Sequence, residues 1–348
     1  MRISNSPPDL YSGIDHLSFD TRPFSPAPDD IEQICRFFSL GKLRHYAVEK
    51  GITVSHSNFF VFAATTRGQY ALKFYPVDAA KSIAIEHAVN RFLIGHHFPT
   101  PAMHAGQKGQ PFLASHNRLA ACYSYIEGVP SWERIKEPKT IHQINSAMFS
   151  LKNILSAAPG RLPFLKNISL AARIRALAQA SRAMAPYGHK RLIDASLKDA
   201  CQSYQRHQPL FTRQRLHNNA GLTNFLISNG TVYTLDLSHI REDYTPSDLA
   251  SLVVSCLFFQ IPQNTIKMIV KGYFEQYKIG PDYAPTLNTL IQIELIREYL
   301  KNVRRKKSAD FSTCPVDFAR TYKLHLATRK KIIAAVLRRM KNTPGLIK

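Results

Sequence analysis

The chain has 348 residues, of which 45% are hydrophobic, and it carries a formal net charge of +22 at pH 7. This length allows one large domain or two smaller ones with proper cores. No apolar run approaches the roughly 20 residues of a membrane-spanning helix, and the opening sequence lacks the apolar segment of a secretory signal. The five cysteines are scattered without C-x-x-C spacing, which argues against a disulfide framework or a zinc site and favours a cytoplasmic protein.

The positive charge is concentrated at the C-terminal end. Residues 297–348 hold 15 Lys or Arg and 3 acidic residues, a net of +12. Basic tails commonly contact nucleic acid, anionic lipid or phosphorylated ligands, but no nucleic-acid signature accompanies this one. An apolar stripe in the tail leaves open a peripheral contact with an anionic membrane, although docking on the protein's own helices is favoured. The stripe consists of Ile333, Val336, Leu337 and Met340.

The first predicted elements are a leader and a short helix. Residues 1–28 contain five prolines and little apolar periodicity, which predicts a flexible leader. A helix is expected after Pro28, capped by Asp29 or Asp30. Its apolar face would consist of Ile31, Ile34, Cys35 and Phe38.

The next segment predicts a small antiparallel sheet with one helix. Strands are expected at 58–66, 69–75, 112–114 and 119–126, and a helix at 79–95. Within 69–75 the side chains alternate, so Ala71, Lys73 and Tyr75 share one face. A lysine among so many apolar residues requires an anionic partner if that face is covered.

From Trp132 onward the pattern is mainly helical, with one β interruption at 225–237. Helices are expected near 139–157, 170–185 and 190–206, and again from 247 onward. In the interruption, Asn229-Gly230 suits a mirror-image two-residue turn. Folding about this turn pairs residue 228 with 231 and 224 with 235, which brings Asn224 and Asp236 to the same end of the hairpin.

These residue types match the needs of phosphoryl transfer from ATP. That reaction requires a cation at the phosphates, a carboxylate that orients the cation, and oxygen ligands for Mg²⁺. Lys73 on a strand and Glu86 on the following helix meet the first two demands. Asn224 and Asp236 on one hairpin meet the third.

Over residues 29–260 the sequence resembles the aminoglycoside phosphotransferase and choline kinase superfamily, and within it the bacterial homoserine kinase-like branch. The resemblance is carried by LGKLR at 40–44, SNFFV at 57–61, GQYALK at 68–73, LHNN at 216–219, TLDL at 234–237 and SDLA at 247–250. It implies an α+β, protein kinase-like two-lobe fold with a nucleotide cleft between the lobes. The small antiparallel sheet lobe would span 29–127 and the larger helical lobe 128–348, with a catalytic-type hairpin at 213–240.

By matched position, the resemblance also implies roles for individual residues. Lys73 would contact the ATP phosphates and pair with Glu86, while Asn224 and Asp236 would hold Mg²⁺. His217 and Asp248 would be structural braces, His217 within the catalytic loop. The other nucleotide contacts would be Ala71 against the adenine, Tyr125 and Glu127 in the hinge, and Ser57 and Asn58 in the phosphate-covering hairpin.

Asn219 departs from this pattern, because the family has its catalytic aspartate there. An amide cannot take the proton of the acceptor hydroxyl, and a positioned general base contributes about 10²–10⁴-fold. His239 or Asp243 could serve as the general base in place of the missing aspartate.

Three functions therefore stay open. The first is a slow kinase acting on the hydroxyl of a small molecule such as a homoserine-like alcohol, an amino sugar or a choline-like compound. The second is a pseudokinase that binds nucleotide or protein, which Asn219 favours. The third is a nucleic-acid-binding protein, which only the charge favours.

Overall fold

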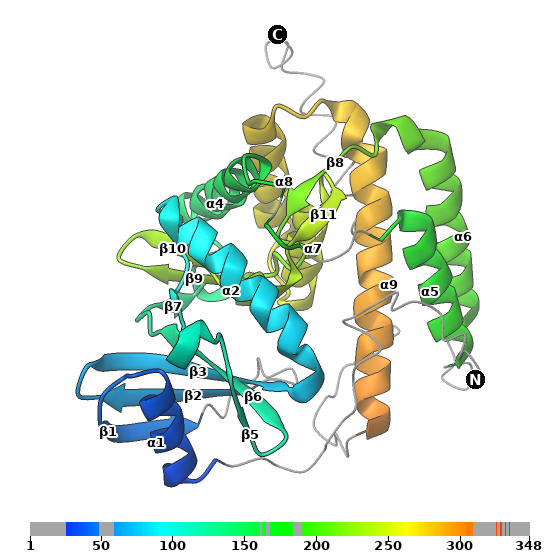
Figure 1. The fold of residues 1–348 in the computed structure, drawn as a ribbon. Helices are drawn as coiled ribbons and strands as arrows, with labels where there is room; N and C mark the ends of the chain where they lie inside the picture. Colours follow the sequence, from blue (N-terminus) through cyan, green and yellow to red (C-terminus); the bar gives the residue numbers. More distant parts are fainter. Residues whose placement is uncertain are drawn as a thin grey trace. The chain divides into compact units, whose positions relative to one another are not determined.

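The computed structural model describes residues 26–48, 59–160, 162–164, 168–183 and 190–308, together with residues 325, 328, 331 and 334 (Figure 1). The chain forms two compact units. The described residues within 19–165 and 215–241 form the sheet unit, and those within 166–214 and 242–348 form the helical unit. The predicted leader lies almost entirely outside the described residues, as does the apolar stripe predicted in the basic tail.

The main sheet of the sheet unit has the strand order β1-β2-β3-β6-β4, with β5 also pairing with β6. All of its strand pairs are antiparallel. Its strands are β1 (Leu43–Val48), β2 (Phe59–Thr65), β3 (Gly68–Pro76), β4 (Met103–His104), β5 (Leu113–Ser115) and β6 (Arg118–Ser124). The four predicted strands are thus confirmed, whereas β1 and the two-residue β4 lie outside the predicted ranges.

Strand β3 separates two apolar clusters. Leu72 and Phe74 are fully buried in the cluster that includes helix α1 (Pro28–Phe37). Tyr75, on the opposite face, packs in the cluster with Ile83 of helix α2 (Ala80–Gly95). Lys73 shares that face by alternation and is only 4% exposed, so its ammonium group requires a partner.

Helix α1 has the predicted apolar face but a different start. Its N-cap is Ala27, because Pro28 takes the first helical position, where its fixed φ and missing N–H are well tolerated. Asp30 lies in the first turn, and its carboxylate accepts the Ala27 N–H at 2.8 Å. The expectation that Asp29 or Asp30 is the cap was therefore wrong in position, although Asp30 does satisfy a backbone donor at the helix start.

A second, three-stranded sheet has the order β10-β9-β7. It consists of β7 (Val129–Pro130), β9 (Phe225–Ser228) and β10 (Thr231–Thr234). The predicted hairpin register is confirmed, since Ser228 pairs with Thr231 and the Leu235 N–H donates to the Asn224 carbonyl at 2.9 Å. Asn229 and Gly230 have φ values of 47° and 76°, as a type I′ turn requires.

Gly128 lies where the connector after β6 passes against β9. A Cβ atom at this position would lie 2.6 Å from the Ile227 carbonyl oxygen. We expect Gly128→Ala to lower the free energy of unfolding by about 1–3 kcal/mol, because the connector and β9 must move apart. Urea denaturation measures this loss. The control is Gly95→Ala, whose Cβ meets nothing within 4 Å; equal losses in both variants would contradict the close-approach argument.

The remaining helices confirm the α+β class with its larger helical part. The helices are α3 (Ser131–Arg134) and α4 (Pro138–Ser156) in the sheet unit, and α5 (Leu170–Ala183), α6 (Lys190–His207), α7 (Ser247–Phe258), α8 (Gln263–Tyr277) and α9 (Ala284–Ser308) in the helical unit. Helix α9 packs against α5, α6 and α7 (Figure 1). Among the described residues, every helix is too short or too polar to cross a membrane. The lobe boundary at residue 127 stays a prediction.

Candidate active site

An ion pair between β3 and the segment after β10 forms the centre of the candidate site. Lys73 Nζ donates to Asp236 Oδ1 at 2.8 Å. Burial alone would lower the pKa of Lys73, but the charges of Asp236 and Glu86 raise it above its ordinary value. Burial likewise acts to raise the pKa of Asp236, but Lys73 and then His239 hold it well below its ordinary value. Both members of the pair are therefore charged at neutral pH.

The backbone of Asp236 is held in an uncommon conformation. Its φ of 55° and ψ of 64° lie in the left-handed region, which costs a residue other than glycine about 1–3 kcal/mol. Ser238, in the turn that follows, donates its hydroxyl to Asp236 Oδ1 at 2.8 Å. Strain of this kind persists where surrounding contacts fix it, and it is concentrated at functional sites.

The loop after β8 (Arg213–Leu216) brings Asn219 to the same carboxylate. Asn219 Nδ2 lies 3.3 Å from Asp236 Oδ2. Since a carboxylate only accepts hydrogen bonds, the amide must present its NH₂ group there. Asn219 and Lys73 thus engage different oxygens of Asp236.

His217 braces this loop through both ring nitrogens. Its Nδ1 accepts the Asn219 N–H at 3.2 Å, and its Nε2 lies 2.9 Å from the Leu235 carbonyl oxygen. One accepting and one donating nitrogen define the neutral imidazole that carries its proton on Nε2. His217 therefore positions Asn219 relative to the segment that carries Asp236.

Asn224 is bonded to the backbone of Asn219 and carries a second candidate oxygen ligand. Its Nδ2 donates to the Asn219 carbonyl at 2.6 Å, so its Oδ1 is the amide atom left for another ligand. A carboxylate and an amide oxygen are hard ligands of the kind that Mg²⁺ and Ca²⁺ prefer. The donor types of Asp236 and Asn224 therefore fit a divalent cation.

Glu86 is buried near Lys73, but its hydrogen bonds come from tyrosine. Tyr75 donates its hydroxyl to Glu86 Oε2 at 2.9 Å, and its oxygen also lies 2.7 Å from the Tyr123 hydroxyl. Burial raises the pKa of Glu86 against the opposing charge of Lys73. Lys73 Nζ also lies 4.6 Å from the centre of the Tyr75 ring. Glu86 thus acts on Lys73 through its charge, and direct pairing of the two stays a prediction.

The two tyrosines were not predicted as site residues. Tyr75 follows Lys73 by two positions on one strand, so the alternation of β3 was the available signal. Tyr123 lies on the neighbouring strand β6, opposite Ala71, and the sequence contains no sign of that register.

The structure describes only some of the remaining residues that were expected to contact the nucleotide. Ala71 lies on the Lys73 face of β3. Tyr125 is exposed, its ring packs edge-on against Phe62, and its N–H donates to the Gln69 carbonyl at 3.2 Å. Glu127 is exposed in the connector. Ser57 and Asn58 lie outside the described residues.

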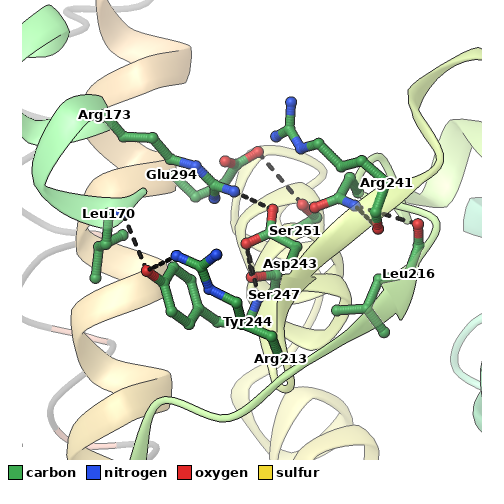
Figure 2. Close-up of polar contacts among 11 residues, drawn as sticks. Leu170, Arg173, Arg213, Leu216, Arg241, Asp243, Tyr244, Ser247, Ser251 and Glu294 are labelled. Atoms are coloured by element: carbon green, nitrogen blue, oxygen red, sulfur yellow. Dashed lines mark hydrogen bonds and ion pairs between the residues drawn. The ribbon is translucent and has the colours of Figure 1, made fainter. Parts of the chain in front are cut away.

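Asp243, one of the two groups considered as a substitute base, is engaged in the helical unit (Figure 2). Arg173 of α5 forms an ion pair with Asp243 Oδ2. The other oxygen of Asp243 accepts the Tyr244 N–H at 2.7 Å and the Ser247 hydroxyl at 3.3 Å. Asp243 is 1% exposed. It therefore ties β11 (Arg241–Tyr244) to α5 and α7, which is a structural role.

We predict that the Arg173–Asp243 ion pair contributes measurably to the stability of the protein. We expect Arg173→Lys to lower the free energy of unfolding by about 1–3 kcal/mol, because an ammonium group cannot reproduce the guanidinium geometry and leaves a buried acceptor poorly paired. Chemical denaturation measures the change. Arg175→Lys, two residues along α5 and exposed, is the matched control. A loss as large in the control would contradict the assigned role.

Comparisons with known proteins bear on the fold. No protein-family model matches the chain, and no curated protein matches it in sequence. An aminoglycoside phosphotransferase from Alicyclobacillus acidocaldarius is similar in structure, with a TM-score of 0.67, 12% identity, and coverage of 93% of this chain and 99% of the other. The amicoumacin kinase hAmiN, in complex with AMP-PNP, Ca²⁺ and Ami, gives a TM-score of 0.64 at 12% identity and covers 88% and 92%. A choline kinase from Cryptosporidium parvum gives 0.62 at 14% identity and covers 89% and 98%.

These likenesses extend over nearly the whole length of each chain. The protein therefore has the two-lobe, protein kinase-like fold that aminoglycoside phosphotransferases and choline kinases share.

Proposed function

We propose that the protein is an ATP-dependent phosphotransferase that acts on a hydroxyl group of a small molecule, and that Asn219 makes it slow. The observation that carries the proposal is the buried ion pair of Lys73 and Asp236, with an N–O distance of 2.8 Å. Asn219 donates to the same carboxylate, and Asn224 donates to the backbone carbonyl of Asn219. A structural neighbour of this chain is a kinase in complex with AMP-PNP and Ca²⁺.

In this proposal the sheet unit binds the nucleotide. Lys73 would donate to the phosphates, and Ala71 on the same strand face would lie against the adenine. Because the Tyr125 N–H is already hydrogen-bonded within the sheet, the adenine edge would meet the backbone of 126–128, including that of Glu127. Glu86, held by Tyr75, would keep Lys73 charged through its own negative charge.

Asp236 and Asn224 would hold a divalent cation, with Mg²⁺ as the expected ion. When bound, this ion would neutralise charge on the phosphates. The role of the chain is to hold its two oxygen ligands in place. The left-handed backbone of Asp236 and the hydrogen bond from Ser238 fix the carboxylate. The bond from Asn224 to the Asn219 carbonyl fixes the amide.

The amide of Asn219 affects the step in which the phosphoryl group is transferred. The acceptor oxygen forms a bond to the γ-phosphorus while the bond from that phosphorus to the β–γ bridging oxygen breaks, so ADP leaves. The acceptor hydroxyl must also lose its proton. Asn219 Oδ1 could accept a hydrogen bond and orient the hydroxyl, but it cannot take the proton. The proton would pass to solvent, which slows the step without preventing nucleotide binding.

A second candidate function is a pseudokinase that binds nucleotide or protein and has lost the chemistry. Asn219 is the specific observation that favours it. Lys73, Asn224 and Asp236 remain in this case, so a nucleotide site is expected under both functions. The two proposals differ only in whether γ-phosphate is transferred.

The test uses the full chain with γ-labelled ATP, MgCl₂ and a panel of acceptors: amino sugars, choline-like amino alcohols and homoserine-like alcohols. The expected result is slow transfer of label to one class of acceptor, with ADP formed in equal amount. A melting-temperature shift with ATP but no transfer to any acceptor would favour the pseudokinase. No shift and no transfer would overturn both the phosphotransferase and the nucleotide-binding pseudokinase.

A further inference from the structure

The carboxylate of Asp236 is hydrogen-bonded on both oxygens. Lys73 Nζ and the Ser238 hydroxyl engage Oδ1, each at 2.8 Å. Asn219 Nδ2 engages Oδ2 at 3.3 Å. A divalent cation that binds Asp236 must therefore displace a donor or share an oxygen with it.

We propose that Asn219 sets the affinity of this site for divalent cations, by competing with the cation for Asp236 Oδ2. The inference rests on the proposed function, because it takes Asp236 and Asn224 as the ligands of the ion. It goes beyond that function because it assigns to Asn219 an effect that is separate from proton transfer. In the wild-type protein, divalent cations bind weakly in the absence of nucleotide.

The charge balance leads to the same conclusion. Lys73 and Asp236 form a neutral pair, so an incoming cation meets a lysine ammonium group within hydrogen-bond distance of its carboxylate ligand. Cation affinity rises with the number of charged carboxylate ligands. With an amide at 219, the loop adds a hydrogen-bond donor and no negative charge.

An aspartate at 219 would reverse both effects. Its carboxylate would replace the amide about one hydrogen-bond length from Asp236 Oδ2, and two carboxylates so close cannot both stay ionised without a cation. A divalent ion between them removes that repulsion. Asn219→Asp is therefore expected to bind a divalent cation about 10- to 100-fold more tightly than wild type, a range typical of changes around metal ligands.

Mn²⁺ alone, titrated into the full-length protein without nucleotide, tests the inference. Free Mn²⁺ is followed by its electron paramagnetic resonance signal, which needs no enzyme activity. The variants are Asn219→Asp, Asn219→Ala and Asp236→Asn. Asn153→Asp serves as the matched control, because it adds the same charge at an exposed position of α4 in the same unit.

The expected order of affinity is Asn219→Asp, then Asn219→Ala, then wild type. Asn219→Ala binds more tightly than wild type because it removes the competing donor without adding charge. Asp236→Asn binds no Mn²⁺, and Asn153→Asp behaves as wild type. Equal affinities in wild type and Asn219→Asp, or tight binding that persists in Asp236→Asn, would overturn the inference.

The same preparations are melted with and without ATP, so that failure of this inference is distinguished from failure of the proposed function. An ATP-induced shift together with unchanged Mn²⁺ affinities would overturn only the role of Asn219. No ATP-induced shift in wild type would overturn the proposed function itself.

Discussion

Replacing Lys73 with methionine is expected to abolish most of the stabilisation by ATP and to lower kcat/KM for phosphate transfer about 10²–10³-fold, the usual cost of removing one positioned donor at a site of developing charge. Lys73 is the charged donor that β3 places next to Asp236, in a setting where it is 4% exposed. Methionine keeps an apolar stem and removes only the ammonium group, which lies over the Tyr75 ring.

Differential scanning fluorimetry measures this change. ATP at about 100 times its Kd stabilises a protein by about 2.7 kcal/mol, so its loss is easily resolved. Each variant is compared with its own unliganded baseline, because Lys73→Met also removes the ion pair of Asp236. Asp236 keeps the donors Ser238 and Asn219, which limits that cost.

Lys81→Met is the matched control for this prediction. Lys81 is exposed on α2 in the same unit, so the substitution removes the same charge away from the site. The control is expected to keep the full ATP-induced shift. If Lys73→Met also kept the full ATP-induced shift, the proposal that the nucleotide binds at this ion pair would be wrong.

Much of the fold could be predicted because local patterns decide it. The alternation of β3 set its two faces before any partner strand was known, and Asn229-Gly230 fixed the hairpin register through backbone geometry alone. Helix bounds near 139–157, 170–185 and 190–206 followed from apolar periodicity. These features depend on neighbours along the chain, and the sequence contains those neighbours.

The contacts of the site could not be predicted in the same way. The sequence places Lys73 near Asp236 only through a family resemblance, and it contains no sign that Tyr75 hydrogen-bonds Glu86. The hydrogen-bond partner of each side chain depends on which residues of β3, β6 and α2 meet in the tertiary structure. The prediction of the N-cap of α1 was wrong for a local reason. Pro28 takes the first helical position, so the N-cap is Ala27.

The second large effect is expected from Asn219→Asp, which should raise the rate of phosphate transfer about 10²–10⁴-fold, the usual contribution of a positioned general base. The loop already holds residue 219 beside Asp236 through His217, so the new carboxylate would occupy a prepared position. The rate is measured as label transfer from ATP to the acceptor found in the panel. A carboxylate base should also give the variant an acidic limb in its pH–rate profile that wild type lacks.

Asn219→Ala separates the two effects of the aspartate. It removes the amide from Asp236 without supplying a base, so it should change cation affinity while leaving the transfer rate at or below that of wild type. Transfer in Asn219→Asp alone would identify the natural protein as a pseudokinase whose chemistry a single carboxylate restores. Equal rates in Asn219→Asp and wild type would mean that the proton has another acceptor. That acceptor would have to be a group other than Asp243, whose two oxygens are held by Arg173, Tyr244 and Ser247 in the helical unit.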